Sequence, residues 1–135
     1  MIRTYVDTGV LIAAARGETA VAFKALDILD DPNREFASSM FVKLEVVPKA
    51  AYNKNEAEGE FYETFFSRVI SWADSFDAIV HGAFKEACDS GLAALDALHV
   101  VSAVHADAEE LVTTERLDKA IHRTRLIRVV SIAPV

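Results

Sequence analysis

The sequence predicts an α/β fold: a three-layer α/β/α arrangement with a short, mostly parallel central sheet. Short apolar runs typical of buried strands alternate along the chain with longer segments of helical spacing, as in parallel sheets covered on both faces. The 135 residues are 52% hydrophobic and 26% charged, which fits a folded chain with a real core. No linker, repeat or low-complexity tract divides the chain, so we expect a single domain over residues 1–135.

The first half of the chain is expected to contain two strands and three helices. The strands are at residues 2–6 and 35–38, and the helices are at about 10–16, 18–30 and 40–48. Gly17 is a natural stop for the first helix, and a turn at residues 31–33 precedes the second strand. Ser39 is a good N-cap for the third helix, which we expect Pro48 to kink or end.

The second half is expected to contain three helices and two strands. The helices are at residues 56–73, 75–90 and 95–105, and the strands are at 111–113 and 127–132. An aromatic stripe at helical spacing marks the first of these helices: Phe61, Phe65, Val69 and Trp72. We favour core packing for this stripe, with partner contacts as the alternative. The helix at 95–105 is apolar on nearly all sides, which predicts a central, buried position.

Composition narrows the location and the partners. No apolar stretch approaches the ~18 residues that a membrane helix needs. The N-terminal segment, broken by Asp7, would make a poor signal peptide, so we expect a cytoplasmic protein with no membrane partner. Cys88 is the only cysteine and is expected as a helix-core thiol. The net charge of −7 argues against nucleic-acid binding without excluding it, because acids that belong to a metal site would be offset by the metal.

Four acids lie where neither a plain core nor a plain surface would place them: Asp7, Glu45, Asp96 and Glu115. Asp7 and Glu115 follow strand-like runs, whereas Glu45 and Asp96 interrupt apolar helical runs. A buried carboxylate without a partner is costly, so such a group is paired, protonated or bound to a metal. The ligand crevice of an α/β fold lies at the carboxyl ends of its strands, where all four acids can meet. The pattern predicts one divalent-metal site.

Each acid also has a simpler explanation. Asp7 and Asp96 can cap helices. Glu45 can be an exposed residue of a short helix, and Glu115 can belong to an ordinary turn. His99, three residues after Asp96, can orient a carboxylate, although a helix histidine with satisfied hydrogen bonds is the favoured interpretation. These explanations are independent of one another, so the four acids together favour a shared site.

Four motifs follow one another along essentially the whole chain: Val6-Asp7-Thr8-Gly9-Val10-Leu11, Ser38-Ser39 with Glu45, Leu95-Asp96-Ala97-Leu98-His99, and Val112-Thr113-Thr114-Glu115. In this order and spacing they resemble the PIN-domain family, and most closely the VapC-type toxins of prokaryotic toxin–antitoxin pairs. The resemblance implies Asp7, Glu45 and Asp96 as core acids, with Glu115 as the fourth, that hold Mg²⁺ or Mn²⁺ and cut RNA. It also implies Thr8 and Asp118 as additional candidates. Gly9 and Glu115 depart from the residues most frequent at their positions in the family.

The expected function is therefore that of a metal-dependent endoribonuclease, which hydrolyses RNA phosphodiester bonds at a carboxylate-held Mg²⁺ or Mn²⁺ site. The resemblance further implies a toxin with a cognate antitoxin and a homodimer as partners. Four basic residues are candidates for steering the phosphate backbone: Lys43, Lys49, Arg116 and Arg123. The main alternative is a catalytically inactive PIN-like module that binds RNA or protein, which Gly9 and Glu115 favour. A phosphatase-type domain with Asp7 as nucleophile is a weaker alternative.

Overall fold

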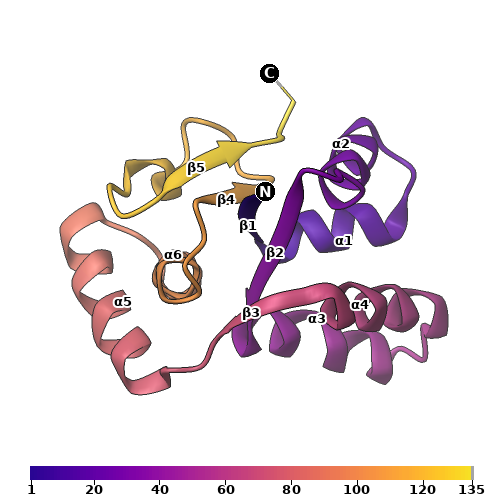
Figure 1. Cartoon of the computed structure of the whole chain (residues 1–135), viewed down its shortest axis with the longest axis horizontal. Coiled ribbons are helices and arrows are strands. Elements are labelled where there is room, and N and C mark those ends of the chain that lie inside the picture. The colour runs from indigo at the N-terminus through magenta and orange to yellow at the C-terminus, as the bar shows by residue number, and fades with distance from the viewer. Residues whose placement is uncertain (135) are drawn as a thin grey trace.

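Five strands form one sheet at the centre of the protein, in the order β3-β2-β1-β4-β5 (Figure 1). A computed structural model describes residues 1–134 of the chain. The strands are β1 (Ile2–Val6), β2 (Arg34–Ser39), β3 (Val69–Ala73), β4 (Glu110–Thr113) and β5 (Arg128–Ser131). Neighbouring strands pair in parallel throughout this sheet, so the predicted three-layer α/β/α class is confirmed.

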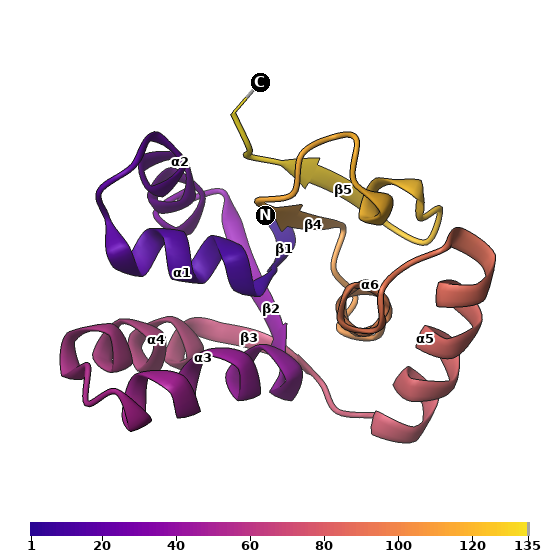
Figure 2. The ribbon, with the colours of Figure 1, turned by 180° about the vertical axis from the view of Figure 1, so that it is seen from behind.

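Helices cover both faces of the sheet. They are α1 (Thr8–Arg16), α2 (Ala20–Leu29), α3 (Met40–Tyr52), α4 (Glu56–Arg68), α5 (Phe76–Ser90), α6 (Ala94–His105) and the 3₁₀ helix η1 (Ala120–Arg123). In Figure 1, α5 and α6 lie to the left of the strands and the four other α-helices lie to the right; Figure 2 shows the same layers from behind. Helix α6 packs between α5 and the sheet, so the predicted buried helix is confirmed.

No single helix within residues 1–134 is long and apolar enough to cross a membrane. By length and composition alone α5 and α6 would pass as a pair, but they are bent by 119° at their junction.

The carboxyl ends of β1, β2 and β4 lie side by side at one edge of the sheet. Strand β1 is central and pairs with β2 on one side and β4 on the other. Val6 is in register with Val112, and the Asp7 amide donates to the Val112 carbonyl at 3.0 Å. Ser39, the last residue of β2, begins α3 at the same edge. The topology therefore brings residues that are a hundred positions apart to one place.

Local signals in the sequence mark where the helices begin and end. Gly17 and Gly91 adopt left-handed backbone with φ of 65° and 68°, directly after α1 and α5. Only a residue without a Cβ takes this conformation at little cost, so both glycines act as helix stops. Thr19 and Ser39 cap α2 and α3 through side-chain oxygens that accept backbone N–H bonds.

The helix predicted for residues 56–73 is wrong in its last turn. Helix α4 ends at Arg68, and Val69–Ala73 form the edge strand β3, which pairs with β2. In a run this short, the apolar side chains satisfy helical and strand spacing alike. The pairing edge offered by β2 then favours the extended form, which suits the β-branched residues Val69 and Ile70.

Two smaller predictions also need correction. Of the two outcomes expected at Pro48, a helix end is wrong, because α3 continues to Tyr52 with Pro48 inside it. The proline ring removes the hydrogen bond to the Leu44 carbonyl, and Leu44 is 71% exposed, so water can replace the lost donor. Cys88, expected in a helix core, is exposed on α5 because the buried side of that helix is formed by Ile79 and Ala83.

The aromatic stripe contributes to packing, as favoured from the sequence. Tyr62, Phe65 and Phe66 of α4 are buried, and the rings of Phe66 and Trp72 lie 5.7 Å apart. Lys43 of α3 lies over both of those rings, with its Nζ 5.3 Å and 5.0 Å from their centroids. Through these contacts α4 and β3 pack against α3.

Candidate functional site

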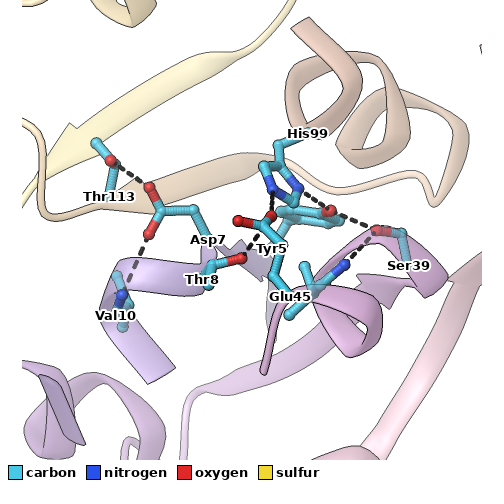
Figure 3. Close-up of polar contacts among 9 residues, drawn as sticks. Tyr5, Asp7, Thr8, Val10, Ser39, Glu45, His99 and Thr113 are labelled. Carbon is cyan, nitrogen blue, oxygen red and sulfur yellow. Dashed lines mark hydrogen bonds and ion pairs between the residues drawn. The ribbon is translucent and has the colours of Figure 1, made fainter. Parts of the chain in front are cut away.

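Asp7 lies at the carboxyl end of β1 and is both a helix cap and a buried acid. Its Oδ1 accepts from the Val10 amide at 3.2 Å, and its Oδ2 accepts from the Thr113 hydroxyl (Figure 3). The residue is only 9% exposed. Burial raises the pKa of the Asp7 carboxyl and the charge of Glu115 raises it further, while the two hydrogen bonds oppose this. A cap needs neither this burial nor this neighbour, so capping alone does not account for Asp7.

Glu45 reaches from α3 toward α6 and α1, and two side chains hold it. Its Oε1 lies 2.6 Å from Nε2 of His99 and accepts from the Thr8 hydroxyl at 2.9 Å (Figure 3). The hydrogen bond with His99 is the largest cause that lowers the pKa of Glu45, and burial opposes it. Glu45 is therefore an ionised carboxylate with two side-chain hydrogen bonds, and not a surface acid without partners.

Asp96 lies in the first turn of α6, whose N-cap is Ala93, and no side chain caps this helix. The capping explanation for Asp96 therefore fails. Burial raises the pKa of Asp96, and the charges of Glu115 and Glu45 raise it further. Glu115 follows β4, and its carbonyl oxygen accepts from the Ser131 hydroxyl at 2.6 Å, which fixes the backbone at this point.

The four acids share one electrostatic environment. Glu115 raises the pKa of both Asp7 and Asp96, and Glu45 acts on Asp96 in the same sense. All four offer oxygen ligands, which Mg²⁺ and Mn²⁺ prefer, and their mutual repulsion is the kind that a divalent cation relieves. The donor type and the charge therefore fit such an ion.

The same side chains do not form a ready-made metal cage. Within residues 1–134, no three His, Cys, Asp or Glu side chains are grouped so that they could hold a metal ion. Asp7 is engaged by Thr113, and Glu45 by His99 and Thr8. Ligation by more than two of the acids would need side-chain rotations, and the predicted four-acid metal site stays a prediction.

A cavity of about 310 Å³ opens beside Thr8 and Glu45, between α1, α3 and α4. Its walls also include polar and charged side chains: Arg16, Lys49, Asn53, Asn55, Glu58 and Tyr62. The Glu58 carboxylate already accepts from Asn55 at 2.9 Å and from Tyr62. Lys49 has no carboxylate within ion-pair distance in the described part of the chain. It is therefore available to an anion that enters next to Glu45.

The remaining basic candidates have other surroundings. Lys43 stacks on two aromatic rings, as described above. Arg116 lies 3.5 Å from Asp118, and the two form an exposed ion pair. Asp118 is the additional acid that the resemblance implies. Arg123 lines a separate cavity near Gly91. Of the four basic residues, Lys49 is the one that lines the cavity next to Glu45.

Sequence reasoning missed two hydroxyl groups at the site. The Tyr5 hydroxyl lies 2.7 Å from Ser39 Oγ and 2.8 Å from His99 Nδ1, although the residue is fully buried in β1. Thr113, also fully buried, donates to Asp7. A tyrosine in a strand that is expected to be buried is itself a signal, because its hydroxyl then needs a partner.

The comparison with known families agrees with the fold. A family model described as the PIN domain matches residues 4–125, so the chain belongs to the PIN domain family. The predicted family is thereby confirmed. No curated protein sequence matches the chain.

Solved structures with the same fold include VapBC2 of Rickettsia felis bound to a promoter DNA fragment, with a TM-score of 0.72 and 19% identity over 96% of this chain and 98% of that one. DNA-bound VapBC of Salmonella typhimurium gives a TM-score of 0.72 and 19% identity over 98% of this chain and 100% of that one. A toxin–antitoxin complex from Klebsiella pneumoniae gives 0.71 and 19% over 98% and 99%. At these identities the likeness establishes the fold.

Proposed function

We propose that the chain is a metal-dependent endoribonuclease whose site comprises Asp7, Glu45, Asp96 and Glu115. The observation that carries the proposal is the shared electrostatic environment of these acids at the carboxyl ends of β1 and β4. Glu115 raises the pKa of Asp7 and of Asp96, and Glu45 raises that of Asp96. Like charges this close are costly for a fold to keep together, which supports a functional reason for their grouping. Residues 1–135 are proposed to act as one PIN-like domain.

The proposed roles follow from how each side chain is held. Asp7 and Asp96 would ligate Mg²⁺ or Mn²⁺, since Asp7 is buried at the end of β1 and Asp96 is half-buried in the first turn of α6. Glu45 and Glu115 would ligate through water or hold the attacking water. When bound, the cation would supply an activated water and offset charge on the phosphoryl oxygens. Thr8 donates to Glu45 and is proposed to orient it.

Lys49 is proposed to bind a phosphate of the RNA. The residue lines the cavity next to Glu45 and has no carboxylate at ion-pair distance within residues 1–134. The positive charge of Lys49 would offset the repulsion between the acidic site and the RNA. Lys49 would also align the RNA strand so that a neighbouring phosphodiester reaches the carboxylates.

A role as the toxin of a toxin–antitoxin pair is supported by the solved structures with the same fold, which include a toxin–antitoxin complex. We propose a cognate antitoxin that covers the acidic site. A homodimer and a cytoplasmic location are proposed on the same resemblance, and sedimentation of the purified chain tests the homodimer.

The decisive experiment is an RNase assay on partner-free protein with Mg²⁺ or Mn²⁺, with and without chelator. The wild type should cleave RNA only without chelator, and Asp7→Asn should lose the activity while keeping its fold, since Asn can still cap α1. Asp27→Asn, an exposed acid of α2, is the matched control and should cleave normally. Full activity of Asp7→Asn would refute the site.

The second candidate is an inactive PIN-like module that binds RNA or protein. The observation in its favour is that no three of the acidic side chains are grouped as a metal-binding set in residues 1–134. This candidate predicts RNA or protein binding that persists in chelator, with no cleavage in either metal.

A further inference from the structure

A line of buried hydrogen bonds runs from the interior of the sheet to Glu45. It passes from Ser39 at the end of β2 to the Tyr5 hydroxyl in β1, at 2.7 Å, and from there to His99 Nδ1 in α6, at 2.8 Å. His99 Nε2 then meets Glu45 Oε1 at 2.6 Å (Figure 3). Ser39 and Tyr5 are fully buried and His99 is 4% exposed, so few competing waters reach these groups.

The chemistry of the groups sets the direction of this line. An ionised Glu45 can only accept, so His99 Nε2 must donate to it. His99 Nδ1 is then satisfied by accepting from the Tyr5 hydroxyl, and Tyr5 in turn accepts from Ser39. The phenolic hydroxyl of Tyr5 can donate one hydrogen bond and accept another. Each group thus has a partner of the correct kind.

Both donors to Glu45 contact the same oxygen. Thr8 and His99 each bond Oε1, and Oε2 receives no hydrogen bond within the described residues. In Figure 3 this second oxygen points in the direction of Asp7. The contacts therefore fix the position of Oε1 and leave Oε2, which receives neither of these bonds, on the side of Asp7.

We propose that His99, anchored by Tyr5 and Ser39, is a positioning residue that holds Glu45 with one carboxylate oxygen free for a metal ion or its bound water. The second half of this inference rests on the proposed function; the positioning of Glu45 by His99 does not. A simpler role for His99, as a core side chain that fills space, would make no distinction between its two ring nitrogens.

Two substitutions separate these roles. A glutamine amide reaches about as far as the ring Nε2, so His99→Gln keeps the donor to Glu45. An asparagine amide reaches about as far as Nδ1, so His99→Asn keeps the contact with Tyr5 but loses Glu45. Loss of a hydrogen-bond partner that orients a metal ligand typically costs about 10–100-fold in metal affinity or activity. We expect a loss of about that size in Mn²⁺ affinity, measured by calorimetry, and in kcat for His99→Asn. His99→Gln should recover most of the loss.

The controls address folding and location. His105→Asn replaces an exposed histidine of the same helix and should leave Mn²⁺ affinity unchanged. Tyr5→Phe removes the anchor but keeps the ring, and should give a loss smaller than that of His99→Asn. Equal Mn²⁺ affinity for His99→Asn and wild type, or equal losses for His99→Asn and His99→Gln, would overturn the proposal.

A metal-free measurement keeps this inference separate from the proposed function. The melting temperatures of His99→Asn, Glu45→Gln and the double variant are compared in chelator. Non-additive changes support a direct coupling between the two side chains, and additive changes overturn it. A wild type that neither binds Mn²⁺ nor cleaves RNA would refute the proposed function. The comparison of the single variants with the double variant would still decide whether His99 positions Glu45.

Discussion

Asp7 makes the metal-free protein sensitive to pH through a single buried side chain. Its pKa is raised above the ordinary value of 3.8, mainly by burial, so the folded state binds the proton more tightly than the unfolded state. The associated stability is complete below pH 3.8 and is lost as the pH rises through the folded pKa. Glu45 has the opposite sign: its lowered pKa gives stability that is lost as the pH falls.

Asp7→Asn should therefore gain stability relative to wild type as the pH rises, because asparagine never carries the buried charge. The melting temperatures of the two proteins in chelator, recorded from acid to neutral pH, give this difference directly. A difference that stays constant over the range would show that Asp7 is not the group responsible. Glu45→Gln should show the reverse trend, falling further below wild type as the pH rises.

The space beside Gly9 is filled by a residue 105 positions away in the sequence. A Cβ at Gly9 would collide with the Thr114 hydroxyl oxygen and would lie 3.5 Å from Asp7 Oδ1. Thr114 follows β4 and occupies the space beside Asp7 that a side chain at position 9 would need. The absence of a side chain at position 9 is thus matched to Thr114 on another chain segment, a contact that no local pattern in the sequence reveals.

The close approach of Gly9 and Thr114 predicts that the effect of Gly9→Ala on stability depends on the residue at position 114. Alanine inside a helix is favoured over glycine by roughly 0.5–1 kcal/mol, so the substitution should stabilise α1 by about that amount in a Thr114→Ala background. With Thr114 in place, the forced rotation of its hydroxyl should cancel the gain. Urea unfolding of wild type, Gly9→Ala, Thr114→Ala and the double variant measures these free energies of unfolding. An equal effect of Gly9→Ala with Thr114 and with Ala at position 114 would contradict this account.

At the scale of elements, α3 carries two lysines with different tasks. Lys43 lies over two aromatic rings and fastens α4 and β3, whereas Lys49 lines the cavity beside Glu45. Lys43→Ala should lower the free energy of unfolding by about 1 kcal/mol through the lost cation–π contacts. Lys49→Ala should leave stability nearly unchanged, weaken RNA binding at low salt and reduce its salt dependence. Weaker RNA binding in both variants, with no loss of stability in either, would contradict these separate roles of Lys43 and Lys49.

The elements also show how far sequence patterns reach. Gly17, Gly91 and Ser39 act through their own backbone or the next turn, so the helix ends they mark were predicted correctly. Val69 and Trp72 were assigned to a helix because the spacing of a five-residue strand fits both structures. Only the pairing edge of β2 decides between them, and that edge is created by the folded sheet.

At the scale of the whole molecule, the topology does what no single motif does. Parallel strands in the order β3-β2-β1-β4-β5 bring the ends of β1 and β4 together, and so Asp7 meets Thr113 and Glu115. The sequence predicts that Asp7 and Glu115 lie at the same edge, because the carboxyl ends of parallel strands share one edge of the sheet. The hydroxyl partners Tyr5 and Thr113 could not be assigned, because their hydrogen bonds depend on register and side-chain packing between strands.

The whole fold should therefore respond to the metal. A ligand that binds only the folded state stabilises it by RT ln(1 + [L]/Kd), which is about 2.7 kcal/mol at a hundredfold excess over Kd. For a domain of this size, each kcal/mol raises the melting temperature by roughly 2–8 °C. Mn²⁺ should raise the melting temperature of wild type, and more at neutral pH than in acid, since Asp7 and Asp96 must lose their protons to ligate. Asp7→Asn should lose most of this shift, while Asp27→Asn keeps it. An equal shift in all three proteins would place metal binding elsewhere on the chain.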